Sequence, residues 1–139
     1  MRVIGLDVGT QTIGVAATDP LGMLAHPVCT VSRKGVKQDV AVLQRILDEQ
    51  EATAIVVGLP YELDGSEARS ARLARQIGDA LGTSSGLSVQ YVDERFSSVE
   101  AERRMIESGT RRKKRQEIID QIAAVVILET WLAMNKEPR

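Results

Sequence analysis

Apolar residues in the first third of the chain form short strand-like runs followed by one helical stripe. Two runs rich in strand-forming residues, Val3 to Val8 and Ile13 to Ala17, flank a turn at residues 9–12 and predict an antiparallel hairpin. A third run, Pro27 to Val31, is expected to add another strand. Apolar positions at helical spacing predict an amphipathic helix from Val36 to Glu49.

Strands and helices then alternate. Two apolar, β-branched runs, Ala54 to Gly58 and Leu87 to Val92, predict strands. An apolar stripe between them predicts a helix from about Glu67 to Leu81, and Gly82 is its expected stop. Each of these strands therefore follows a helix, which is the pattern of parallel crossover units.

Two more helices are predicted after the last strand, one from Ser97 to Gly109 and a strongly apolar one from Ile118 to Met134. In the latter, Ala123 and Ala124 are small enough to let the helix lie close against a sheet. The expected fold class is α/β, with a mixed five-stranded sheet of three antiparallel and then two parallel strands and helices on both faces. Residues 1–139 are expected to form one domain.

Composition supports a globular protein, with 43% hydrophobic and 27% charged residues. No apolar run approaches membrane-spanning length, and Asp7 interrupts the one N-terminal stretch that could act as a signal peptide. We therefore expect no membrane association and a cytoplasmic location. The single cysteine, Cys29, excludes an internal disulfide, and we expect it to be buried.

Positive charge is concentrated in one segment although the whole chain carries a net charge of −1. Residues 95–115 contain eight cations against three glutamates, and five of the cations form an unbroken run at Arg111, Arg112, Lys113, Lys114 and Arg115. We expect this run to form a loop that binds phosphates in a salt-dependent way.

Carboxylates occur where sheets of this class form their sites, at the carboxyl ends of strands. Asp7 ends the first strand, Asp93 and Glu94 follow the last, and Asp120 lies near the start of the final helix. Strand alternation puts Asp93 and Glu94 on opposite faces, so only one of them is expected to join the other acids. Spacing does not say which.

Converging carboxylates need a counter-charge, and hard divalent cations prefer oxygen ligands of this kind. The pattern therefore predicts a site for Mg²⁺ or Mn²⁺. Two such ions can activate a water molecule and hold a scissile phosphate. The alternative is that Asp7 and Asp120 merely cap a turn and a helix and that the basic run is a solvated loop.

Four segments together resemble the YqgF (RuvX) family of Holliday-junction-resolvase-like nucleases, and the resemblance covers essentially the whole chain. The segments are GLDVGTQTIGVAATD at 5–19, VVGLPYELDG at 56–65, VDERFSSVEAE at 92–102 and RRKKRQEIIDQIAAVVILE at 111–129. The resemblance implies an RNase H-like fold and a role at the 5′ end of pre-16S ribosomal RNA, or, by fold, on four-way DNA junctions. This chain departs from the family at Gln11, where relatives often carry a basic residue, and at Ser98, where threonine is usual.

By this resemblance, Asp7, Glu94 and Asp120 are the metal-binding catalytic acids, and Glu94 is chosen over Asp93 on that basis alone. Thr10 and Arg95 are expected to contact the substrate together with the basic run. The implied partner is nucleic acid, either pre-rRNA or branched DNA, and the protein is expected to act as a monomer or a homodimer.

Two other functions compete with this reading. The first hairpin also resembles the phosphate-binding loop of actin-like ATPases and sugar kinases, but those proteins hold ATP between two such domains and 139 residues supply one. We therefore expect no nucleotide cofactor. The second alternative is a non-catalytic nucleic-acid-binding module, for which the discriminator would be a missing acid; none of the three is missing.

Overall fold

The computed structural model describes residues 2–59, 69–93 and 112–135. For residues 112–117 it describes the backbone alone. The elements in chain order are β1 (Val3–Val8), β2 (Thr12–Thr18), β3 (Ala25–Ser32), α1 (Val36–Glu49), β4 (Ala54–Leu59), α2 (Arg69–Ser85), β5 (Ser88–Asp93) and α4 (Arg112–Met134). The helix predicted from Ser97 to Gly109 lies outside the described residues.

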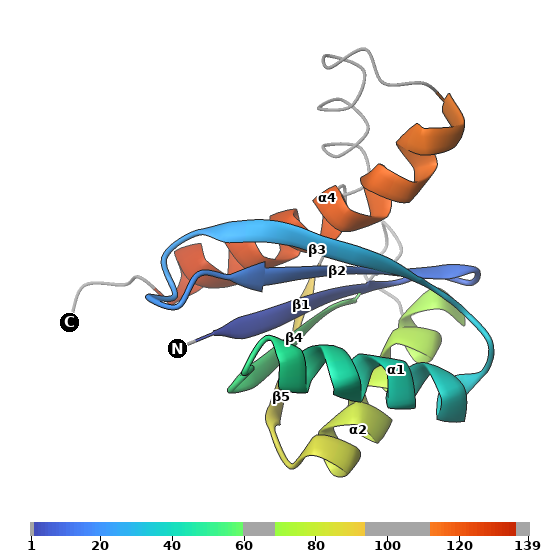
Figure 1. The fold of residues 1–139 in the computed structure, drawn as a ribbon, viewed down its shortest axis with the longest axis horizontal. Helices are drawn as coiled ribbons and strands as arrows, with labels where there is room; N and C mark the ends of the chain where they lie inside the picture. The colour runs from blue at the N-terminus through green and yellow to red at the C-terminus, as the bar shows by residue number, and fades with distance from the viewer. Residues whose placement is uncertain (1, 60–68, 94–111, 136–139) are drawn as a thin grey trace.

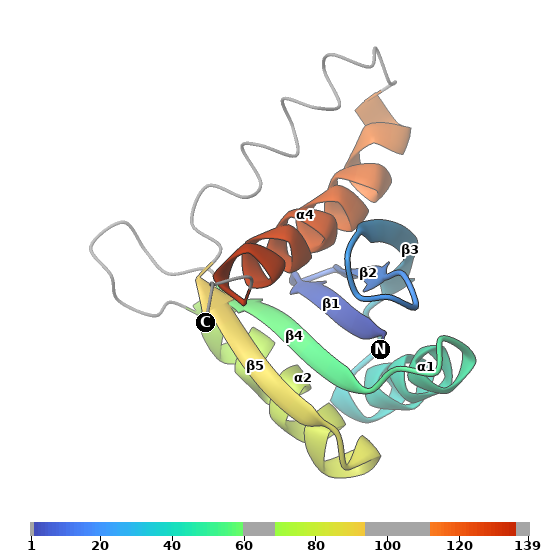
Figure 2. The same ribbon diagram turned by 90° about the vertical axis from the view of Figure 1, so that its left-hand side faces the viewer.

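The five strands form one mixed sheet in the order β3-β2-β1-β4-β5. Strands β1, β2 and β3 are antiparallel neighbours, and β4 runs parallel to both β1 and β5. Figures 1 and 2 show α4 on one face of this sheet and α1 with α2 on the other. The predicted fold class, with three antiparallel strands, two parallel strands and helices on both faces, is confirmed.

Alternation along β1 divides its side chains between two cores. Ile4, Leu6 and Val8 belong to the core under α1 and α2, whereas Val3 belongs to the core under α4. Because successive side chains of a strand point to opposite faces, Asp7 shares the α4 face with Val3. A carboxylate thus ends the row of β1 side chains that α4 covers.

Helix α4 packs on the sheet through small and large apolar side chains. Ala123 and Ala124 are buried, as their size predicted, and Trp131 is buried in the same core. The indole Nε1–H of Trp131 donates to Gln90 Oε1 on β5 at 2.5 Å, which satisfies its polar atom. The helix is therefore fixed along its length against several strands.

Two predicted boundaries are wrong. Helix α2 runs through Gly82 and ends at Ser85. It is followed by Gly86, whose φ of +75° is the left-handed conformation that glycine adopts most readily. Helix α4 begins at Arg112, so the four residues from Arg112 to Arg115 lie in a helix and not in a loop. Arg, Lys, Gln and Glu are good helix formers, and no glycine or proline separates them from the apolar stretch that follows. None of the helices in the described ranges is both long enough and apolar enough to cross a membrane.

Candidate functional site

Asp7 and Asp120 come together around Gly14. Asp7 lies beside Gly14 in the antiparallel register of β1 and β2. The backbone of Asp120 occupies the space directly over Gly14, where a larger residue would place its Cβ. The two carboxylates predicted from the sequence therefore belong to neighbouring positions on the α4 face, at the end of the sheet that carries the 9–12 turn.

Thr12 fixes the carboxylate of Asp120. Its hydroxyl donates to Asp120 Oδ2, which joins the turn end of β2 to α4. Asp120 is half-buried; burial raises the pKa of its carboxyl and the hydrogen bond from Thr12 lowers it, with a net rise. A hydroxyl supplies no positive charge, so a cation bound beside this carboxylate would favour its ionised form. The oxygen donors present fit Mg²⁺ or Mn²⁺.

A groove of about 270 Å³ opens beside Asp120, and the turn between β1 and β2 forms its wall. Thr10 and Gln11 line it and are exposed, and Gly9 and Thr12 complete the lining. Thr10, predicted as a substrate contact, thus lies on the same groove as Asp120. Gln11 gives the groove a neutral hydrogen-bonding group.

Asp93 points away from this site. It pairs with Leu59 in the parallel register of β4 and β5, and Leu59 belongs to the core under α1 and α2. Paired residues of neighbouring strands face the same side of a sheet, so the exposed side chain of Asp93 lies on the α2 side. The sheet separates it from Asp7 and Asp120.

The remaining predicted site residues fall outside what the structure describes. Glu94, Arg95 and Arg111 belong to the undescribed range 94–111, and Arg112, Lys113, Lys114 and Arg115 are placed only as backbone in the first turns of α4. Among the described residues there is no group of three His, Cys, Asp or Glu side chains placed to hold a metal ion. The third acid of the predicted set is therefore untested.

An ion pair between half-buried Arg33 and buried Asp39 holds the 9–12 turn in place, and the sequence patterns did not reveal it. Arg33 Nη1 donates to the Gly9 carbonyl at 2.8 Å, and Arg33 Nε donates to Asp39 Oδ2 at 2.7 Å. The Arg33 backbone N–H also donates to the Gln11 carbonyl at 2.8 Å. Arg33 thus connects both sides of the turn to the first turn of α1.

Asp39 is only 1% exposed in this pair. Burial opposes its ionisation, but the backbone N–H of Lys34, at 2.8 Å, and the Arg33 guanidinium together lower the pKa of the carboxyl. The sequence contained an indication that Asp39 is buried, because position 39 lies on the apolar helical stripe that includes Val36 and Leu43. An acid on a buried stripe requires a partner.

The sequence model of the RuvX family, described as "Holliday junction resolvase", matches residues 1–134. The chain belongs to the RuvX family. A relative from Myxococcus xanthus, named "Putative pre-16S rRNA nuclease", is 45% identical over 138 residues and is matched over 99% of this chain and 91% of its own length. A relative of the same name from Lachnospira eligens is 42% identical and is matched over 99% of this chain and all of its own length.

Among solved structures, this RuvX-family chain resembles Thermus thermophilus RuvC in complex with a Holliday junction substrate. The TM-score is 0.60 at 16% identity, with 97% of this chain and 96% of RuvC covered. At this identity the likeness shows the fold, which confirms the RuvC-like, RNase H-like arrangement of strands and helices.

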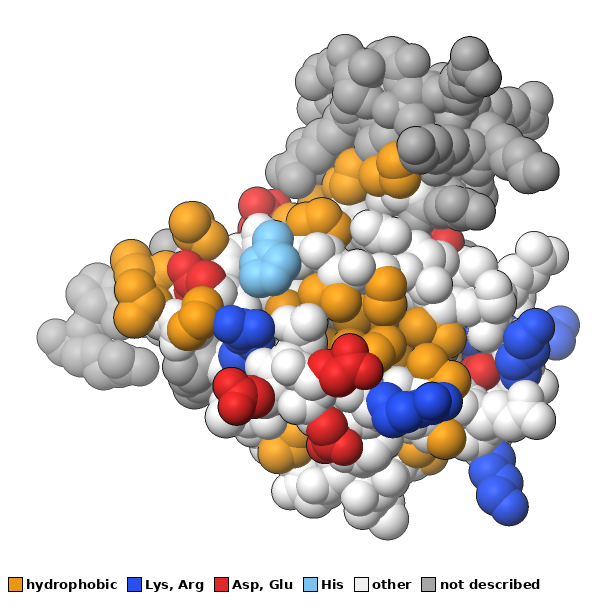
Figure 3. Space-filling model, viewed as in Figure 1, with side chains coloured by type: hydrophobic (Ala, Val, Ile, Leu, Met, Phe, Trp, Pro, Cys, Tyr) orange, Lys and Arg blue, Asp and Glu red, His pale blue; other side chains and the backbone are white. Residues whose placement is uncertain are grey.

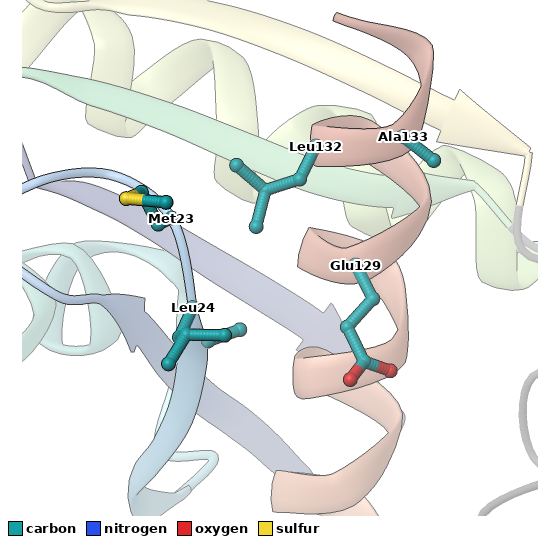
Figure 4. Close-up of a pocket in the computed structure, with 6 residues that line it drawn as sticks. Met23, Leu24, Glu129, Leu132 and Ala133 are labelled. Atoms are coloured by element: carbon teal, nitrogen blue, oxygen red, sulfur yellow. The ribbon is translucent and has the colours of Figure 1, made fainter. Parts of the chain in front are cut away.

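A different groove of the RuvX-family chain lies at the other end of α4 (Figure 4). Met23, Leu24 and Ala25 line one side, and Glu129, Leu132 and Ala133 of α4 line the other, around about 290 Å³. Leu21, Met23 and Leu24 are largely exposed, and Figure 3 shows apolar side chains gathered at this end of the molecule. With one acid among apolar side chains, this groove lacks the ligands that a hard cation needs.

Proposed function

We propose that this protein is a metal-dependent nuclease that hydrolyses phosphodiester bonds in structured RNA and processes the 5′ end of pre-16S rRNA. The observation that carries the proposal is the placement of Asp7 and Asp120 on one face of the sheet, on either side of Gly14 and next to the groove lined by Thr10. The names of two similar relatives, from Myxococcus xanthus and Lachnospira eligens, support the reaction and the substrate.

Asp7, Asp120 and Glu94 would hold one or two Mg²⁺ or Mn²⁺ ions. Asp93 faces α2, so the sheet separates it from Asp7 and Asp120. Glu94, the acid that the family resemblance implies, is therefore the proposed third ligand. When bound, such ions supply activation of a water molecule and stabilisation of the leaving oxygen. The two-ion arrangement is part of the proposal.

The other residues of the chain position the acids and the strand. Thr12 orients Asp120 by its hydrogen bond, and Arg33 holds the turn that carries Thr10. Thr10 and Gln11 offer neutral hydrogen-bonding groups to the substrate where they line the groove. Arg95, Arg111, Arg112, Lys113, Lys114 and Arg115 supply the positive charge that attracts phosphates.

Cleavage of four-way DNA junctions is the second candidate, because the family model is described as a Holliday junction resolvase. A junction has two-fold symmetry, so this function favours a homodimer, whereas the RNA reaction suits a monomer equally well. Either reaction would take place in the cytoplasm. A non-catalytic nucleic-acid-binding role would leave the convergence of Asp7 and Asp120 without a purpose.

The test is a cleavage assay on a pre-16S leader RNA and on a four-way DNA junction in Mg²⁺. Asp7→Asn, Glu94→Gln and Asp120→Asn are each expected to lower the rate at least about 100-fold, because loss of a metal ligand removes several kcal/mol of transition-state stabilisation. Asp48→Asn, on α1 across the sheet, removes an acid of the same charge and serves as the matched control. Equal rates for wild type and Asp7→Asn would exclude the mechanism, and binding of either nucleic acid without cleavage would favour the non-catalytic role.

A further inference from the structure

The groove beside Asp120 has a neighbour on the β3 side, which we call the second groove. The two share Thr12. The second groove encloses about 390 Å³ and is lined by Thr12, Val28, Cys29, Thr30, Ser32 and Gln121. Gln121 follows Asp120 directly in α4, so each groove includes one of two consecutive helix residues. The two grooves meet at Thr12, and the second one lies on the side toward the edge strand β3.

Strand register gathers hydroxyl groups in this second groove. Thr12 pairs with Ser32 across β2 and β3, and Thr30 pairs with Gly14. Gln121 Nε2 donates to Thr30 Oγ1 at 3.0 Å. Ser32 is exposed and the other three side chains are half-buried. The result is a row of neutral hydrogen-bond donors and acceptors that solvent or a ligand can reach.

None of the six lining residues carries a formal charge, and Asp120 lies next to them. A phosphate group is poorly matched to this surface, because no lining cation offsets its repulsion by the neighbouring carboxylate. A ribose matches it better: the sugar is uncharged, and its 2′-hydroxyl both donates and accepts, as do the threonine and serine hydroxyls and the glutamine amide.

We propose that this second groove holds the ribose of an RNA strand that passes over Asp120, and that Gln121 and Thr30 recognise its 2′-hydroxyl. The groove then selects RNA over DNA at a nucleotide next to the cleaved bond. The inference rests on the proposed function, because the cleavage site defines where the strand lies. It adds the residues that distinguish the two kinds of nucleic acid.

The test measures binding without cleavage. A leader RNA hairpin is prepared as a set in which each member carries one 2′-deoxy nucleotide, and its affinity for the Asp7→Asn protein is measured by fluorescence anisotropy. A 2′-deoxy substitution at one or two nucleotides next to the cleaved bond is expected to weaken binding about 3- to 10-fold, which is the effect of losing one or two hydrogen bonds. At those positions, Gln121→Met should abolish the sensitivity to deoxy substitution while leaving the affinity of an all-DNA hairpin within about 2-fold.

Matched variants separate recognition from damage to the fold. Thr30→Val removes the hydroxyl and should reduce the deoxy sensitivity, whereas Thr30→Ser keeps the hydroxyl and should retain it. Gln44→Met makes the same change as Gln121→Met on α1, across the sheet, and should behave as the parent protein. Thermal unfolding of each variant identifies any that fails to fold.

Two outcomes would overturn the inference: no nucleotide shows the deoxy effect, or the effect persists unchanged in Gln121→Met. These outcomes are independent of the nuclease reaction. If the protein cleaves leader RNA but no nucleotide shows the deoxy effect, the proposed function stands and this inference is wrong. If the effect is present but nothing is cleaved, the proposed function is wrong. The groove then still recognises a ribose, but its place next to a cleaved bond is lost.

Discussion

The backbone carbonyl oxygen of Asp120 lies 1.9 Å from the point that a Cβ atom on Gly14 would occupy. Strand β2 and helix α4 can approach this closely only because position 14 has no side chain. The contact brings Asp120 beside the partner residue of Asp7 in the sheet. A glycine that neither binds nor reacts therefore sets the distance between the two acids.

Gly14→Ala should displace α4 from the sheet at Asp120. Overpacking of this kind costs about 1–3 kcal/mol of unfolding free energy, measurable by denaturant titration, and a shift of the carboxylate by about 1 Å would lower the cleavage rate roughly 100-fold. Gly82→Ala, on the other side of the sheet, is the control, because the nearest contact of its Cβ would be a side-chain methyl group of Val89, at 2.8 Å, and not backbone. Full activity in a stable Gly14→Ala protein would contradict the role given to this contact.

Arg33→Met removes the donor that holds the Gly9 carbonyl and leaves Asp39 buried without its cation. We expect a loss of roughly 3 kcal/mol in unfolding free energy and a 10- to 100-fold lower kcat. Adding Asp39→Asn removes the unpaired charge and should restore much of the stability while kcat stays low. Arg45→Met, at an exposed position of α1, is the control. Recovery of kcat together with stability in the double variant would show that the pair serves only the fold.

The lowered pKa of Asp39 also predicts how stability depends on pH. A carboxyl whose folded pKa lies below its unfolded value, near 3.8, contributes stability above that value and loses it as pH falls through the folded pKa. Asp39→Asn should therefore reduce unfolding free energy at pH 7, and its difference from wild type should shrink below about pH 4. Denaturant titrations across this range test the prediction, with Asp48→Asn controlling for net charge; a difference that stays constant with pH would refute it.

A fourfold variant that removes the charges at the start of α4 should bind RNA more weakly and with a shallower salt dependence. It replaces Arg112, Lys113, Lys114 and Arg115 with glutamine. Each phosphate contact contributes about 0.7 to 0.9 to the slope of log K against log salt concentration, so losing four contacts should make the slope shallower by up to about 3 to 4. Lys37→Gln with Arg45→Gln, on α1 across the sheet, should leave the slope unchanged. An unchanged slope in the fourfold variant would remove the start of α4 from the interface.

Sequence patterns predicted the sheet and the helical layers because both depend on local alternation of polar and apolar residues. Asp7 and Asp120 could be found because a charged residue in an apolar run stands out. The boundaries at Gly82 and Arg112 were missed because a single glycine is tolerated in a helix that packs closely and a run of cations is a good helix former.

Contacts between distant segments were less accessible to sequence reasoning. From the sequence, Gly14 is only a residue of a hairpin strand, and its contact with α4 appears only in the folded structure. The role of Thr12 likewise depends on its hydrogen bond to Asp120, which is distant in the sequence. The pairing of Arg33 with Asp39 and Gly9 likewise depends on how the end of β3 meets α1. Such relations require three-dimensional packing, which pattern and spacing do not contain.

The central claim is that Asp7 and Asp120 form one divalent-cation site. Titration of Mn²⁺ into the intact protein, followed by isothermal calorimetry, tests it without reference to substrate. Wild type and Asp48→Asn should show the same saturable binding, and Asp7→Asn and Asp120→Asn should each bind at least about tenfold more weakly, a difference of 1.4 kcal/mol. Wild-type affinity in both Asp7→Asn and Asp120→Asn would contradict the account.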